Sequence, residues 1–282
     1  MRRIVLVVAG QIKLLGRLDR ARLRVLPQGR SQGPPRRRFA ADGPDFTVMT
    51  IKRTTVITGL LALAALSAGC GVVGPLDEET ASYDVADKVA ALQVEADSGT
   101  VEVVESDRQG IHVTEQLSWR KNKPEPSHEV QGDTLVLKFK CATTWGLGSG
   151  AASCEVSYKV EVPKGLRVKV RSDSGTLTLK NLSGGLEASS DSGTIEASGL
   201  AGKQVVTRTD SGDMTLAFTG QPDKVATTTD SGRTVVRVPS GPYNIVARTD
   251  SGDKKIEAAA DSSAQRSIEL TSDSGDLEVV NS

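Results

Sequence analysis

The sequence predicts an all-β fold, a parallel β-solenoid whose rungs of about 20 residues stack into two facing sheets. Apolar and polar residues alternate on both sides of a recurring triplet, as in half-buried strands. From the second copy onward the triplets are 18, 19, 20, 20 and 23 residues apart, a period typical of stacked repeats. The triplet is Asp-Ser-Gly, and its seven copies begin at Asp97, Asp173, Asp191, Asp210, Asp230, Asp250 and Asp273.

Each repeat is expected to be a strand, the Asp-Ser-Gly turn and a second strand. Around Asp210, Val205 and Thr207 precede the triplet at alternating positions, and Met214 and Leu216 follow it. Period-two alternation places these residues on one face of each strand. A second turn marked by Gly or Pro, as at Gly184-Gly185, ends the repeat. Because the inward residues are small, two sheets about 10 Å apart are favoured over a wider three-sided helix.

Asp97 and Asp173 are 76 positions apart, and the stretch between their triplets lacks the motif and is predicted to form longer strands. We expect an irregular N-terminal section of the same domain, serving as an end-cap that protects the edge of the stack. The solenoid domain is assigned to residues 91–282, after a linker at 71–90. Lys254 interrupts the inward apolar pattern and is expected to reach solvent. The last rung, ending at Ser282, leaves open a surface for self-association.

Residues 49–70 have the features of a lipoprotein signal peptide. Lys52 and Arg53 precede an apolar run too short to span a membrane comfortably, and Leu66–Cys70 ends it with small residues and a cysteine. The Cys70 thiol is therefore predicted to carry acyl chains such as palmitate, which would anchor the chain to the extracytoplasmic face of the membrane. Residues 1–48 are either an extension upstream of a true start at Met49 or a disordered basic segment.

The formal charge of the whole chain is zero, but the segments before and after Cys70 differ in charge. Thirteen Lys/Arg and three Asp/Glu precede Cys70, so the 22 basic and 32 acidic residues from Cys70 on carry a charge of −10. An acidic mature chain argues against nucleic acid as a partner. In an oxidising compartment, Cys141 and Cys154 are predicted to form a structural disulfide around a small-residue loop.

The repeated aspartates permit two interpretations. In the first, each carboxylate accepts hydrogen bonds from backbone N–H groups of its own turn, and the glycine supplies the unusual backbone conformation. In the second, the column of acids binds calcium and stabilises the stack. The structural turn is preferred, so no cofactor is expected, although calcium stays open as a low-ranked alternative.

The sequence contains no phosphate loop, nucleophile elbow or zinc pattern, and no rung has an unusual acid cluster. We therefore expect no enzyme, and a polysaccharide-cleaving β-helix is the least favoured alternative. His112 and His128, the only histidines, are predicted to be solvated surface residues. Trp145, within the small-residue loop, is the first choice for an exposed contact with a partner.

The signal with its terminal cysteine, the short linker and the strand–Asp-Ser-Gly–strand units, for example Val168–Leu179 and Val205–Leu216, resemble the putative-adhesin β-solenoid family of bacterial surface proteins, often seen in actinobacterial lipoproteins. The resemblance covers roughly Ala91–Ser282 and transfers no catalytic residues. It implies a lipid-anchored, non-catalytic binding, adhesion or scaffolding module at the cell surface. Its partner is expected to be an unidentified surface protein or glycan. A calcium-stabilised envelope protein is the alternative.

Overall fold

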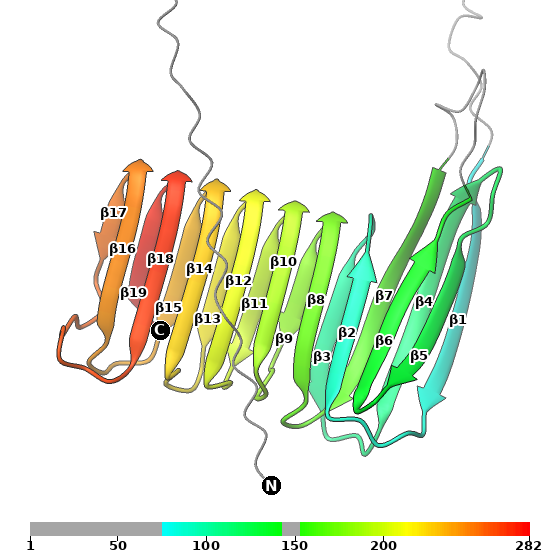
Figure 1. Ribbon diagram of the computed structural model, residues 1–282, viewed down its shortest axis with the longest axis horizontal. Coiled ribbons are helices and arrows are strands. Elements are labelled where there is room, and N and C mark those ends of the chain that lie inside the picture. The colour runs from blue at the N-terminus through cyan, green and yellow to red at the C-terminus, as the bar shows by residue number, and fades with distance from the viewer. Residues whose placement is uncertain (1–74, 143–152) are drawn as a thin grey trace, which may run out of the picture. The chain divides into compact units, whose positions relative to one another are not determined.

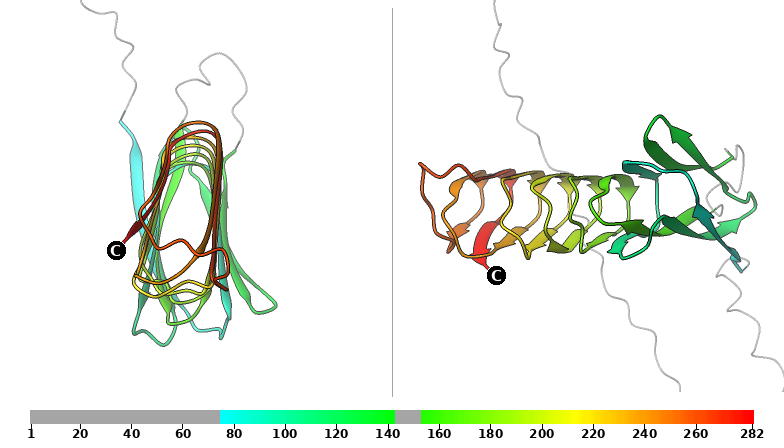
Figure 2. Two further views of the ribbon diagram at one scale, coloured as in Figure 1. Left: turned by 90° about the vertical axis from the view of Figure 1, so that its left-hand side faces the viewer. Right: turned by 90° about the horizontal axis from the view of Figure 1, so that it is seen from below.

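The computed structural model describes residues 75–142 and 153–282, and all regular elements in them are β-strands. The strands form a ten-stranded sheet A and a nine-stranded sheet B, which face each other across a shared core (Figures 1 and 2). The prediction of an all-β fold with two facing sheets is confirmed. Both sheets are mixed rather than wholly parallel, because the N-terminal strands pair antiparallel. No helix in the described residues is long and apolar enough to cross a membrane.

The spatial order of the strands differs from their order in the sequence. Sheet A contains, from one edge to the other, β1 (Asp77–Val85), β4 (Ile111–Arg120), β7 (Ser153–Pro163), β3 (Val101–Ser106), β9 (Leu177–Lys180), β11 (Ile195–Leu200), β13 (Met214–Phe218), β15 (Thr234–Val238), β19 (Leu277–Asn281) and β17 (Lys254–Ile256). Sheet B contains β16 (Asn244–Ser251), β18 (Ser267–Ser274), β14 (Lys224–Ser231), β12 (Gln204–Ser211), β10 (Leu186–Ser192), β8 (Arg167–Ser174), β2 (Ala91–Ala96), β6 (Thr134–Lys140) and β5 (Glu125–Gln131).

The repeats alternate between the two sheets. In each Asp-Ser-Gly unit the strand before the turn lies in sheet B and the strand after it lies in sheet A. Equivalent residues of neighbouring repeats are in register, so Leu186 of β10 is paired with Val168 of β8 and Val205 of β12. The alternate residues that face inward are buried and form one continuous apolar core. Burial of these apolar side chains is the main force that holds the sheets together.

Close packing at the turns explains the repeated glycine. A Cβ atom built on Gly193 would lie well inside van der Waals contact with the carbonyl oxygen of Gly175 in the neighbouring rung. The same conflict with the preceding glycine in the stack recurs at Gly212, Gly232 and Gly275. Some of these glycines have a left-handed backbone, for example Gly232 with φ 122°, but Gly193 is not among them. The shared requirement is therefore the close approach of stacked backbones, which only glycine permits.

The N-terminal section extends both sheets beyond the regular rungs. Strands β2 and β3 stack directly on β8 and β9, although their Asp-Ser-Gly triplets begin 76 positions apart. The inserted β4 and β7 continue sheet A, and β5 and β6 continue sheet B. Strand β1 then pairs antiparallel with β4 along its whole length. Residues 77–85 therefore form an edge strand inside the segment 71–90, for which the sequence predicted a linker. Its first four residues are exposed acids and a threonine, so the strand has little apolar alternation to reveal it.

The C-terminal rungs do not follow sequence order. Strands β18 and β19 insert between β14–β15 and β16–β17, so the rung that ends the stack is β16–β17 and not the one that ends at Ser282 (Figure 1). Burial explains the exchange. The inward residues Leu270 and Leu277 of the inserted rung are fully buried, whereas Ile256 of β17 is 38% exposed and Lys254 is exposed as predicted. The rung with the poorer apolar face lies at the end, where it covers only one neighbour.

Candidate ligand-binding surface

A groove crosses the outer face of sheet B near the beginnings of its strands. It measures about 340 Å³ and runs over β6, β2, β8, β10 and β12. Gly185, just before β10, leaves the space open because it has no side chain between the flanking Arg167 and Gln204. The outward-facing Val206 of β12 is 46% exposed in the groove. The groove therefore combines a small apolar area with long polar side chains.

Two ion pairs involve charged side chains that line the groove. Arg167 Nη2 lies 3.0 Å from Asp133 Oδ2, and Lys169 Nζ lies 2.8 Å from Glu187 Oε1. All four side chains are more than half exposed, so these pairs contribute little stability and can exchange partners. The lining side chains offer donors and acceptors for a polar ligand. Glu187 is the single carboxylate of the lining, which does not match the two carboxylates of most glycoside hydrolases.

The structure corrects the predicted role of the turn aspartates. Their side chains are exposed or half-exposed at the ends of the sheet B strands, and among the described residues none accepts a hydrogen bond from a backbone N–H. Asp210 instead accepts a hydrogen bond from Arg208 Nη2 at 3.2 Å. The acids that follow the glycine do contact backbone: Asp213 accepts from the N–H of Arg233 at 2.8 Å. Outward orientation of the triplet aspartates follows from strand alternation, since the preceding residue faces inward.

The turn aspartates do not gather into a metal site. In residues 75–142 and 153–282, no three His, Cys, Asp or Glu side chains converge in a way that could hold a metal ion. The turn aspartates of neighbouring rungs lie in one row, where Arg171 is 4.0 Å from both Asp173 and Asp191. The row is thus partly balanced by guanidinium groups of the same face.

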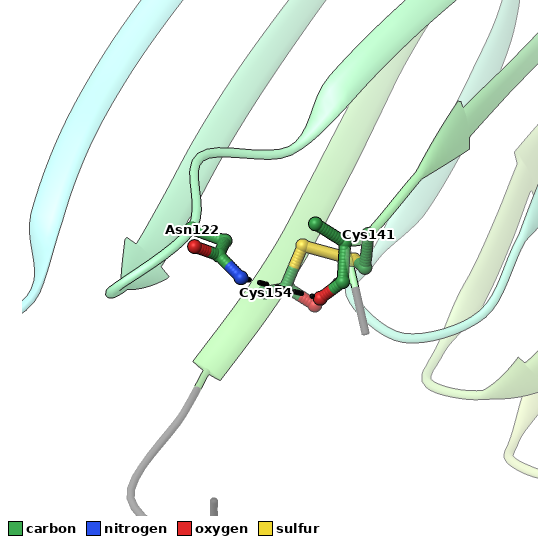
Figure 3. Close-up of a disulfide and its surroundings, with 4 residues drawn as sticks. Asn122, Cys141 and Cys154 are labelled. Carbon is green, nitrogen blue, oxygen red and sulfur yellow. Dashed lines mark hydrogen bonds between the residues drawn. A yellow bond between two sulfur atoms is a disulfide. The ribbon is translucent and has the colours of Figure 1, made fainter. Parts of the chain in front are cut away.

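Cys141 and Cys154 form the predicted disulfide (Figure 3). Cys141 directly follows β6 of sheet B, and Cys154 lies in β7 of sheet A, so the bond ties the two sheets together in the N-terminal section. Nearby, Asn122 Nδ2 donates a 3.4 Å hydrogen bond to the carbonyl oxygen of Ala142. Two other predicted site residues, Cys70 and Trp145, lie outside the described residues.

The histidines lie in the N-terminal section and make local contacts. His112 Nδ1 lies 2.9 Å from Asp84 Oδ1 on the outer face of sheet A. The ring of His128 on β5 stacks on Tyr83 of β1, with ring centroids 4.5 Å apart. His128 is exposed, as predicted, and His112 is partly exposed.

A buried carboxylate, that of Glu115, is hydrogen-bonded to Tyr83. Glu115, only 4% exposed, accepts a 2.7 Å hydrogen bond from the Tyr83 hydroxyl. Burial, reinforced by this hydrogen bond and by the charge of Glu115, raises the pKa of Tyr83 far above its ordinary value. Burial also raises the pKa of the neighbouring Tyr158, whose hydroxyl has no hydrogen-bond partner in the described part of the chain. The sequence pattern alone does not reveal this cluster, because an inward Glu115 in an otherwise apolar strand resembles an irregular repeat.

The groove is likewise not evident from the sequence pattern. Gly184 and Gly185 were interpreted only as a turn, and that interpretation fits Gly184, whose Cβ would collide with the backbone of Leu166. At Gly185 an added Cβ would meet no atom closer than 4.0 Å. The one sign of the groove in the sequence is Gly185, a glycine that its own backbone conformation does not require. That this glycine opens a groove depends on the strands on either side of it, which are known only from the tertiary structure.

Fold and groove together define a class of protein, the all-β repeat modules with two facing sheets and a groove on one outer face. The model of the Toastrack DUF4097 family matches residues 89–281, and the chain belongs to that family. Among curated proteins, none matches this chain.

Two solved structures are similar to the chain at 12% identity. One is a putative cell adhesion protein from Clostridium sporogenes ATCC 15579, with a TM-score of 0.42 and coverage of 73% of this chain and 100% of that one. The other is a putative adhesin from Bacteroides fragilis NCTC 9343, with a TM-score of 0.41 and coverage of 73% and 97%.

Proposed function

We propose that this protein is a lipid-anchored, extracytoplasmic and non-catalytic module that binds a polar ligand, a surface protein or a glycan, in the groove on sheet B. The observation that carries the proposal is the groove, in which polar side chains surround the space left by Gly185 on a regular sheet. Binding sites are commonly concave, with an apolar area and a few polar groups that orient the ligand. Stacked strands fix the backbone positions of those groups, so little backbone freedom is lost when a ligand binds.

The groove chemistry suits recognition more than turnover. Gln204 and Lys169 can donate hydrogen bonds and Glu187 can accept them, which is what hydroxyl-rich or peptide ligands require. The lining contains no His, Cys or Ser, the residues most familiar as catalytic base and nucleophile. The calcium alternative receives no support from the described side chains, and the polysaccharide-cleaving alternative lacks its second carboxylate in the groove.

Photo-crosslinking in living cells tests the binding proposal. A photoreactive residue at Val206 is expected to give a discrete adduct, because this side chain lies in the groove and is exposed. Thr228, exposed on the same face of sheet B but outside the groove, is the matched control. Mass spectrometry of the adduct distinguishes a protein from a glycan. Absence of an adduct at Val206, or equal adducts at both positions, would contradict binding in the groove.

Lipid anchoring is tested separately at Cys70. The full chain is expected to incorporate an alkyne analogue of palmitate, and Cys70→Ser is expected to lose the label completely, because the thiol is the acylated group. The variant should also leave the membrane fraction. The disulfide variant Cys141→Ser/Cys154→Ser, which removes the other two cysteines, should keep the label. Equal labelling of the wild-type and Cys70→Ser chains would contradict the anchoring proposal.

A further inference from the structure

Sheet A ends in two open edges. Among the described residues, β1 pairs only with β4 at one end, and β17 pairs only with β19 at the other end (Figure 1). The outer N–H and C=O groups of an edge strand can pair with a strand of another chain. The two edges lie at opposite ends of the row of strands, so one copy can offer one edge while it receives the other.

The charges of the edge strands are opposite in sign. Strand β1 contains the acids Asp77, Glu78, Glu79 and Asp84 and no Lys or Arg, whereas β17 contains Lys254 and Lys255 and no acid. The edges of sheet B differ in the same direction, since β5 has two glutamates and no Lys or Arg, and β16 has one arginine and one aspartate. Glu79 and Asp84 already pair with Lys123 and Arg108, and Lys255 pairs with Glu257 and Glu278. The uncompensated charges are therefore those of Asp77 and Glu78 on β1 and of Lys254 on β17. Through these charges two like edges repel each other, and unlike edges attract.

Some of these charges face the core side of the sheet. Lys254 is in register with the buried Leu277, so it points toward the space between the sheets although it is exposed. Asp77 lies on the same face of β1 as Tyr83, which packs against the core. Inward-facing charges protect an edge from indiscriminate pairing. Pairing of the β17 edge of one copy with the β1 edge of another is not opposed in this way, because Lys254 of one copy can neutralise Asp77 of the other. Neither side chain forms an ion pair within the described residues.

Exposed apolar side chains gather at the same ends. The chain has four large exposed hydrophobic residues in its described part: Leu76, Val130, Val206 and Ile256. Leu76 directly precedes β1, Val130 lies on the edge strand β5, and Ile256 lies on β17. Only Val206 lies away from the ends, in the groove. Apolar surface at both edges adds a non-directional contribution to the attraction between unlike charges.

We propose that copies of this protein associate head to tail, with the β1 edge of one copy on the β17 edge of the next. Such an interface is heterologous, because the two copies contribute different surfaces. A pair of copies joined in this way leaves one β1 edge and one β17 edge free, so further copies can add to it. The proposal is independent of the ligand in the groove, which lies on the outer face of sheet B.

Charge reversal tests the interface in the full chain, purified in detergent at less than one chain per micelle. Sedimentation velocity of the wild type in about 50 mM salt is expected to show concentration-dependent oligomers that dissociate in about 500 mM salt, because salt screens exposed charges. Lys254→Glu should weaken association at least tenfold. Lys224→Glu, the same change at an exposed position in the middle of sheet B, should leave association unchanged.

Mixing two variants provides the decisive measurement. Asp77→Lys/Glu78→Lys should also fail to associate alone, because the uncompensated charges at both of its edges are then positive. Mixed with Lys254→Glu, it presents the reversed, positive charges of its β1 edge to the reversed, negative charge on the β17 edge of the other variant, and association should return to within about threefold of the wild type. This rescue also shows that both variants are folded. A monomeric wild type at low salt, undiminished association of Lys254→Glu, or a mixture without rescue would each overturn the proposal.

Discussion

Replacing Gly193 by alanine is expected to lower the free energy of unfolding by roughly 3 kcal/mol, the upper part of the range for overpacked sites. The added methyl group would collide with the Gly175 carbonyl oxygen of the adjacent rung, and it would also lie close to the Ser190 hydroxyl. Backbone on one side and a buried side chain on the other leave little room to relax. The rungs on either side must therefore separate or shift, which disturbs the register of both sheets.

Denaturant unfolding of the two variants Gly193→Ala and Gly185→Ala measures this effect. Gly185 has no neighbour closer than 4.0 Å to an added Cβ and no left-handed backbone, so its replacement should change stability by less than about 0.5 kcal/mol. Comparison of the two variants distinguishes the steric conflict between stacked backbones from the effect that removing any glycine has on the unfolded chain. Equal stability changes in the two variants would show that the turn backbones are not packed as described.

Loss of the disulfide is expected to destabilise the protein by about 3 kcal/mol, as the chain-entropy model gives for a loop of this length. The bond closes residues 141–154 and joins the end of β6 in sheet B to β7 in sheet A. There the two sheets extend beyond the regular rungs. Thermal unfolding of Cys141→Ser/Cys154→Ser should therefore begin at a clearly lower temperature than that of the oxidised wild type.

Reduced wild-type protein is the internal control for this prediction. It should unfold like the double variant, because both lack the cross-link and differ only at two sulfur atoms. Native-state hydrogen exchange should locate the weakening in β4, β6 and β7 and leave the rungs around β12 unaffected. If the wild type unfolds at the same temperature with and without reductant, the disulfide carries no stability and the loop prediction fails.

The regular part of the fold was predictable because its signals are local. Alternation around Asp210 identifies the inward Val205 and Leu216 without any knowledge of the partner strand, and both are fully buried. The triplet spacing then implies stacking, since one such unit has too little apolar area to be stable alone. The Cys141–Cys154 pair was predictable for a similar reason, because the cysteines are few and the loop between them is short.

The groove and the polar cluster of the N-terminal section were not predictable in this way. Gly185 opens the groove only because Arg167 and Gln204 lie on the neighbouring strands. Glu115 is buried only because β1 supplies the Tyr83 hydroxyl that donates to it. Each depends on a pairing between residues distant in the chain. The turn aspartates were misjudged for the opposite reason: a local turn motif was expected, and strand alternation turned their side chains outward instead.

By itself, the sequence determined that the chain forms strands of alternating burial, where the turns between them fall, and that two cysteines bridge. These properties depend on residues within one repeat or one loop. Only the tertiary structure decided the order of the last two rungs and the pairing of β1 with β4. That order depends on which rung buries more apolar surface between two neighbours, so Leu270 and Leu277 lie inside the stack and Ile256 lies at its end. Such a comparison exists only once the rungs are assembled.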